Sequence, residues 1–205
     1  MSSTTRRAYH HGNLREALLD AAEQSIEASG PRGLSIRGLA RAVGVSHAAP
    51  NSHFPDRQAL LDALARRGFE RLGDLLEQAC PTADVVQSSL ETRFRGTMAA
   101  FVKFATDHPE LLDLMFVRKR ANHDPSSQLE AAANAALNPI SRLIDEATGA
   151  GILAPGDRGR QWYLLAALTR GIAALVLSGD IQPEAIETLL TDATATFLRG
   201  NAPEP

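Results

Sequence analysis

The sequence has little of what marks a secreted, membrane-spanning or disulfide-stabilised protein. Its 205 residues include one cysteine, Cys80, so no intrachain disulfide can form, and a reduced, cytoplasmic setting fits that. The first seven residues are polar and basic with no apolar stretch behind them, so we expect no signal peptide. The most apolar window, residues 162–177, contains Arg170 and is too short to span a bilayer. It therefore predicts a buried helix, and no membrane partner is expected.

Sequence signatures of catalysis and of metal binding are also missing. No Gly-x-Ser-x-Gly, phosphate-binding loop or His-Glu-x-x-His occurs. Residues 149–154 match a dinucleotide fingerprint loosely, but they follow a predicted helix where that fingerprint follows a strand. Cys80 has no histidine nearby, and His10 and His11 have no third ligand at suitable spacing. We therefore expect no catalytic residue, no metal and no cofactor, and an enzyme is the less favoured alternative.

The net charge of −3 hides an uneven distribution along the chain. Residues 1–71 hold ten Arg and Lys against seven Asp and Glu, whereas residues 72–205 hold eleven against seventeen. Four of the six histidines also lie in the first segment. A basic head on an acidic body suits a protein that places one end on the phosphates of DNA.

Apolar residues recur at helical spacing throughout, and no alternating β-branched runs occur, which predicts an all-α protein. Gly, Pro and N-capping residues divide the pattern into about nine helices. Their expected ranges are 13–29, 35–43, 46–54, 56–80, 84–107, 109–121, 126–149, 157–178 and 183–199. The fourth helix is about 35 Å long, enough to connect two domains. We expect a three-helix DNA-binding domain over residues 1–56, this connecting helix over 57–80, and a ligand-binding and dimerisation bundle over 81–205.

Residues 34–54 have the pattern of a helix-turn-helix. Ser35 and Ser46 can cap two short helices, and Ala40 is small enough to allow their close crossing. Gly44 lies at the turn, where positive φ is needed. The second helix would then lie in the major groove. A plain helical hairpin is the alternative, because two helices around a central glycine are common.

The surrounding residues make the pattern more specific. Ala21 and Ala22 lie in the first helix, Gly30 to Ser46 read Gly-x-x-Gly-Leu-Ser-Ile-Arg-Gly-Leu-Ala-x-x-x-Gly-Val-Ser, and His53-Phe54 and Arg57 follow. On these motifs, residues 13–72 resemble the N-terminal domain of the TetR family of bacterial transcriptional regulators.

The rest of the chain resembles one branch of that family, with a WHG-type C-terminal domain. The matching segments are the opening Tyr9-His10-His11-Gly12-Asn13-Leu14-Arg15, Phe101-x-x-Phe104-x-x-x-His108-Pro109-x-Leu111, and Arg170-Gly171. Arg170 is a departure, because that branch usually has histidine there.

The resemblance implies a set of DNA-binding residues. Ser35 and Arg37 would meet phosphate, and Arg7 would reach a neighbouring groove as part of a flexible arm. The expected base-reading positions are His47, Ala48, Asn51 and Ser52, with His53 and Arg57 on the DNA backbone. Pro50 and Asn51 depart from the family pattern, which usually has an aromatic at position 51. They favour an altered or weakened operator preference, or a helical interaction protein with a degenerate DNA-binding head.

The resemblance also implies a homodimer that releases a palindromic operator when a small-molecule effector binds, and hence a repressor. The expected dimer contacts are Leu164, Leu168, Gly171, Leu175, Ile186, Leu190, Ala193 and Phe197; an intramolecular core is the alternative. The effector would be largely apolar, and a changed tilt of the connecting helix would alter the spacing of the heads. Candidate ligand contacts, which can equally be core residues, are Phe94, Met98, Phe101, Phe104, Met115, Phe116, Leu143 and Trp162.

Overall fold

The computed structural model describes residues 14–80, 89–121 and 127–203, and within these ranges the chain is helical without strands. The α-helices there are α1 (Leu14–Ser29), α2 (Ile36–Val43), α3 (Arg57–Ala79), α4 (Leu90–Asp107), α5 (Pro109–Ala121), α6 (Gln128–Gly149), α7 (Arg158–Leu177) and α8 (Ile186–Gly200). Three 3-10 turns join them: η1 (Pro31–Gly33), η2 (Ala49–Ser52) and η3 (Pro183–Ala185). The all-α prediction is confirmed.

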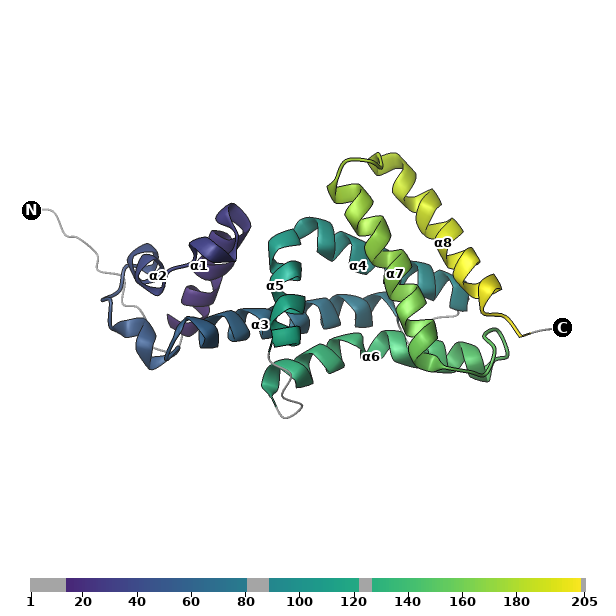
Figure 1. Ribbon diagram of the computed structural model, residues 1–205, viewed down its shortest axis with the longest axis horizontal. Coiled ribbons are helices and arrows are strands. Elements are labelled where there is room, and N and C mark those ends of the chain that lie inside the picture. The colour runs from purple at the N-terminus through teal and green to yellow at the C-terminus, as the bar shows by residue number, and fades with distance from the viewer. Residues whose placement is uncertain (1–13, 81–88, 122–126, 204–205) are drawn as a thin grey trace, which may run out of the picture.

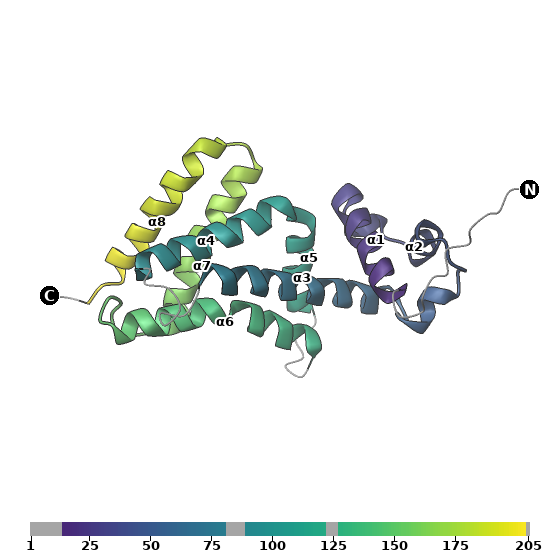
Figure 2. The same ribbon diagram turned by 180° about the vertical axis from the view of Figure 1, so that it is seen from behind.

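The helices form a small head and a larger body joined by α3 (Figure 1). The head consists of α1, α2 and η2 around the start of α3. Helix α3 then runs into the body, where it packs against α4, α5 and α6. Helices α7 and α8 lie at the end of the molecule away from the head and pack against each other and against α4 (Figure 2).

Helix boundaries follow local chemistry that the sequence indicates. The hydroxyl of Ser35 accepts a hydrogen bond from the amide of Gly38 at 3.3 Å, and the carboxylate of Asp56 accepts one from Ala59 at 2.8 Å. Gly44 ends α2 with φ of 78°, a left-handed conformation that favours glycine. The expected cap at Ser35 and the turn at Gly44 are therefore confirmed, and Asp56 caps α3 in the same way.

The third expected helix is wrong in type, because residues 46–54 form successive tight turns. The amides of Ala49 and Asn51 donate to the carbonyls of Ser46 and Ala48, three residues back, at 3.1 and 3.2 Å. Pro50 has no N–H, so it cannot donate the helical bond to Ser46 that would start an α-helix here. Only the 3-10 turn η2 results, and Ser46 makes no side-chain cap to it.

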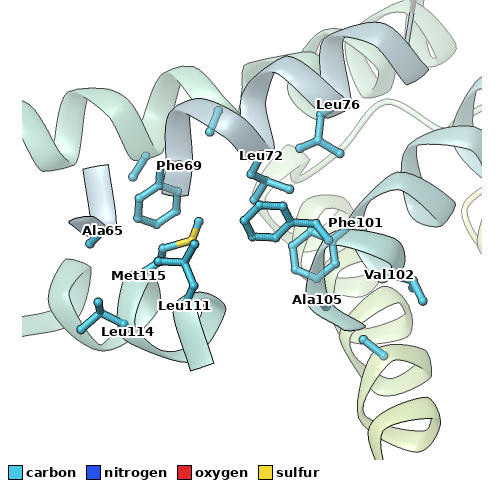
Figure 3. Close-up of a cluster of buried hydrophobic side chains, with 14 of the residues drawn as sticks. Ala65, Phe69, Leu72, Leu76, Phe101, Val102, Ala105, Leu111, Leu114 and Met115 are labelled. Atoms are coloured by element: carbon cyan, nitrogen blue, oxygen red, sulfur yellow. The ribbon is translucent and has the colours of Figure 1, made fainter. Parts of the chain in front are cut away.

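The core is organised along one face of α3. Phe69 and Leu72 are fully buried in the middle of this helix, and Figure 3 shows Phe69 beside Met115 and Leu111 of α5. A Cβ added at Gly73 would lie 3.0 Å from the Cα of Ala136, so the glycine lets α3 and α6 approach to backbone contact. Helix α3 is thus the element on which the body packs.

A charged cluster joins the head to the body. The guanidinium of Arg67 on α3 bonds Asp20 and Glu23 of α1, each at 2.6 Å, and Arg71 also pairs with Glu23. Glu27 of α1 accepts the amide of Leu111 on α5 at 3.4 Å. We call these residues the head–body cluster. Through it α1 contacts both the connecting helix and the start of α5.

A buried arginine ties α4 to α6. Arg93 is 4% exposed, and its guanidinium donates to the carboxylate of Glu146 at 2.6 Å. This hydrogen bond holds the pKa of Glu146 below its ordinary value and raises the pKa of Arg93. Because the lowered pKa belongs to the folded state, the pair stabilises the fold at neutral pH, and the stabilisation is lost as pH falls through the pKa of folded Glu146.

Replacing Glu146 with Gln leaves the Arg93 charge buried without a carboxylate. We expect Glu146→Gln to lower the free energy of unfolding at pH 7 by about 1 kcal/mol, a modest value because solvent screens the half-exposed carboxylate. Urea unfolding at several pH values measures it, and the difference from wild type should shrink below about pH 4. Glu77→Gln, which breaks an exposed pair with Arg142, is the control. A difference independent of pH would contradict the assignment.

Candidate DNA-binding surface and ligand pocket

The segment 46–53 presents its polar side chains outward. His47, Ala48, Asn51 and Ser52 are exposed, and His53 is half-buried. Pro50 is buried below them, as is Phe54, which is 2% exposed. The turn is therefore anchored by two apolar residues, with the expected base-reading positions at the surface.

Unpaired arginines accompany this segment in the head. Arg37 is exposed on α2, and it has no hydrogen-bond or carboxylate partner among the described residues. The same holds for Arg32 of η1 and Arg41 of α2, which our sequence analysis did not select. Arg37 and Arg41 are four residues apart and so share a helix face, a spacing that could have identified Arg41. The expected Arg7 lies outside the described residues.

Two of the expected phosphate contacts already have roles within the chain. The hydroxyl of Ser35 caps α2. The guanidinium of Arg57, at the start of α3, donates to the carbonyl of Leu34 at 3.2 Å and to that of Pro31. Arg57 therefore ties the α1–α2 connection to the connecting helix, which the sequence pattern did not reveal.

A narrow pocket lies between α4, α5, α6 and α7, with a cavity volume of about 30 Å³. Four of the eight expected ligand contacts line it: Met98, Phe101, Phe116 and Trp162. The walls also contain four aliphatic side chains from α6 and α7, together with three polar residues that our sequence analysis missed, Thr97, Thr169 and Arg170.

The other four expected ligand contacts lie in the packed core, away from the lining of this pocket. Phe94 packs against Phe197 of α8 with ring centroids 5.5 Å apart, and Phe104 contacts His108. Met115 lies against Gly68 of α3. The remaining one, Leu143, is fully buried.

Arg170 closes one side of the pocket. Its guanidinium carbon lies 3.7 Å from the centroid of the Phe116 ring, a cation–π contact. Burial, together with the nearby positive charge of Arg120, lowers the pKa of Arg170. Within the described ranges, no hydrogen-bond acceptor or carboxylate contacts this guanidinium.

The expected dimer contacts divide into two groups. Leu164 and Leu175 of α7 are 39% and 43% exposed, Gly171 between them is exposed, and Leu168 and Ile186 are half-buried. In contrast, three residues of α8 face the chain's own core: Leu190, Ala193 and Phe197. These three residues pack against α4 and α7 of the same chain, so the structure leaves little of them exposed to a partner.

None of the helices in the described ranges is long and apolar enough to cross a membrane. No cluster of three or more histidine, cysteine or acidic side chains there is arranged to hold a metal ion.

Comparison with known proteins gives a consistent family match. A model described as bacterial regulatory proteins, tetR family, matches residues 18–64, and one described as tetracyclin repressor-like, C-terminal domain, matches residues 94–197. No curated protein matches the chain.

Solved structures agree in fold. A protein of unknown function from Rhodococcus sp. RHA1 is 44% identical, with a TM-score of 0.83, over 97% of this chain and 100% of that one. A TetR family transcription regulator from Marinobacter aquaeolei VT8 is 17% identical, with a TM-score of 0.72, over 94% and 97% of the two chains. A regulatory protein in the tetR family from Rhodococcus RHA1, 17% identical, has a TM-score of 0.71 over 94% and 98%. At such low identity the last two show the fold alone.

The fold, the exposed head and the two matched models define a bacterial regulatory protein that binds DNA and responds to a ligand. The chain belongs to the TetR family. The family inferred from residues 13–72 is thereby confirmed.

The hydrogen bonds of Arg57 predict a stability effect that Arg37 does not share. Arg57→Met leaves the carbonyls of Pro31 and Leu34 without their charged donor, so we expect the head to lose about 1–2 kcal/mol of stability. Amide hydrogen exchange over residues 31–36, with thermal unfolding, measures it. Arg37→Met, which removes no contact within the described chain, should stay within about 0.5 kcal/mol of wild type. Equal exchange in both variants would refute the structural role of Arg57.

Proposed function

We propose that the chain is a transcriptional repressor that binds a two-fold symmetric operator as a homodimer and releases it when a small molecule enters the α4–α7 pocket. Residues 1–56 would bind DNA, residues 57–80 would connect, and residues 81–205 would bind the effector and dimerise. The proposed function requires no catalysis. A repressor that binds the bacterial chromosome would be located in the cytoplasm. The observation that carries it is the exposed, polar turn at 47–52 in a head with unpaired arginines.

DNA contact would use two kinds of side chain. Arg32, Arg37 and Arg41 have no partner among the described residues, so phosphates can neutralise them without breaking an internal ion pair. Asn51 can bond adenine through both of its amide atoms, and Ala48 can contact a thymine methyl. His47 and Ser52 flank them, with His53 beside the DNA backbone.

The dimer would form on the exposed face of α7. Leu164, Gly171 and Leu175 lie on this face, and Leu164 and Leu175 leave large apolar side chains exposed on it. Large apolar side chains gathered on one helix usually mark an interaction site. Gly171 would let the two copies approach closely, and a closed two-fold dimer would present two heads at once.

The effector signal would pass through Phe116. This residue lines the pocket from α5, and its ring meets Phe69 of α3 edge-on, with centroids 5.5 Å apart and planes at 80°. A drug-sized ligand needs roughly ten times the volume of the present cavity, so binding would move Phe116 or its neighbours. Because α5 also contacts Glu27 in the head–body cluster, such a shift can alter how the head sits on the body.

A second candidate function rests on the 3-10 geometry of η2. A recognition segment without an α-helix offers a shorter surface to the major groove, which favours an interaction protein with a degenerate head. The two functions differ in whether any DNA fragment is bound at low salt.

Gel-shift titration against the promoter of the protein's own gene tests DNA binding. Arg37→Gln should weaken binding to all fragments alike and reduce the slope of log affinity against log salt by about 2 per dimer. Asn51→Ala should instead change fragment preference, costing about 1–3 kcal/mol on the best site. Arg199→Gln, on α8, is the control. If the protein binds no genomic fragment at low salt, the result contradicts the repressor and supports the interaction protein.

Sedimentation equilibrium tests the dimer. We expect Leu164→Glu to raise the dimer dissociation constant at least about tenfold, because two buried carboxylates would face each other across the two-fold axis. Val117→Glu alters a similarly exposed apolar residue of α5, and it should leave the constant unchanged. If the wild type is a monomer, or if Leu164→Glu leaves the dimer dissociation constant unchanged, α7 does not form the dimer interface.

A further inference from the structure

The polar groups of the α4–α7 pocket are unevenly distributed. Its wall is otherwise apolar, contains no acidic residue, and has one cation, Arg170. The hydroxyls of Thr97 and Thr169 each donate to a carbonyl four residues back in their own helix, at 2.8 Å. They therefore offer lone pairs to a ligand but no free proton, and among these three polar groups only Arg170 can donate to it.

Arg170 is exposed overall, and its guanidinium has no charge partner within the described residues. One face of its guanidinium lies on the Phe116 ring, and none of its five N–H donors meets an acceptor among the described residues. A second cation, Arg120 at the end of α5, lies close enough to lower the pKa of Arg170. Arg118 and Lys119 of the same turn pair with Asp62 and Glu130, whereas neither Arg170 nor Arg120 pairs with a carboxylate of the described residues.

We propose that the effector is an amphipathic organic anion whose carboxylate pairs with Arg170 and whose apolar body lies between Met98, Phe101 and Trp162. The inference rests on the proposed function, since it names the ligand class of the same pocket. A carboxylate matches the planar fork of a guanidinium with two parallel hydrogen bonds. It would also relieve the repulsion between Arg170 and Arg120, which a neutral ligand cannot do.

The position of Arg170 also links this anion to the connecting helix. The guanidinium contacts Phe116, and the Phe116 ring contacts Phe69 of α3. A carboxylate that draws the guanidinium toward itself changes the first of these contacts. The ligand charge thus acts on Phe116, which also lines the space that the apolar body would occupy.

Fluorescence titration of the full-length protein tests the proposal. Trp162 is the only tryptophan, and it lines the pocket, so its emission reports occupancy directly. The probes are octanoate, octanamide and octylammonium, which share a tail and differ in charge. We expect octanoate to bind at least about tenfold more tightly than octanamide, and octylammonium to bind most weakly. Added salt should weaken octanoate binding selectively.

Substitutions of Arg170 test whether this residue causes the preference for octanoate. Arg170→Met should weaken octanoate about tenfold while octanamide stays within about twofold, which also shows that the pocket remains folded. Arg170→Lys should restore part of the octanoate preference, and Arg199→Met, which does not alter a residue of the pocket lining, should change the binding of neither probe.

Several outcomes would overturn the inference. Equal binding of octanoate and octanamide, or unchanged octanoate binding by Arg170→Met, would reject an anionic effector while leaving the pocket and the proposed function intact. If no probe alters Trp162 emission up to its solubility limit, this pocket is not the site for such a ligand. The gel-shift titration then decides separately whether the chain is a DNA-binding repressor.

Discussion

Helix α3 packs into both halves of the molecule, and this constrains the position of α1, α4, α5 and α6. Its first turns are buried in the head with Leu60 and Leu61, and its later turns are buried in the body with Phe69, Leu72 and Leu76. A rigid helix about 35 Å long cannot rotate at one end without moving the other. Helix α3 contacts the pocket residue Phe116 through Phe69, and its first turns lie in the head. A change in the pocket that moves Phe116 would therefore be transmitted along α3 to the DNA-binding head.

The two kinds of contact between head and body differ in strength. Apolar packing along α3 sets the position of the head, because buried apolar area contributes most of the stability. The head–body cluster adds several partly exposed ion pairs around Glu23, each of small net value. Because each of these ion pairs contributes little, rearranging the cluster would cost little free energy, and a low cost of this kind is the condition for a ligand to shift a population.

Local chemistry explains what the sequence could predict. Capping residues and breakers such as Ser35, Gly44 and Asp56 act on their immediate neighbours, so helix boundaries follow from the chain alone. The sequence pattern predicts a short helix over residues 46–54, but the N–H that Pro50 lacks falls where so short a helix has no spare hydrogen bond. Side-chain partners are harder to predict. Arg57 bonds carbonyls more than twenty residues away, and no spacing rule reveals that.

Periodicity also cannot tell which neighbour covers an apolar stripe. Phe197 and Leu164 both lie on such stripes, yet one packs inside the chain and the other is exposed. The glycines of α3 have a separate consequence. At Gly73 the helix meets the backbone of Ala136, and at Gly68 it meets the flexible Met115. At both positions the missing side chain lets a neighbouring element lie directly against the α3 backbone. The connecting helix therefore gives up about 1 kcal/mol of intrinsic helix stability at each glycine, and the body around it is thinner as a result.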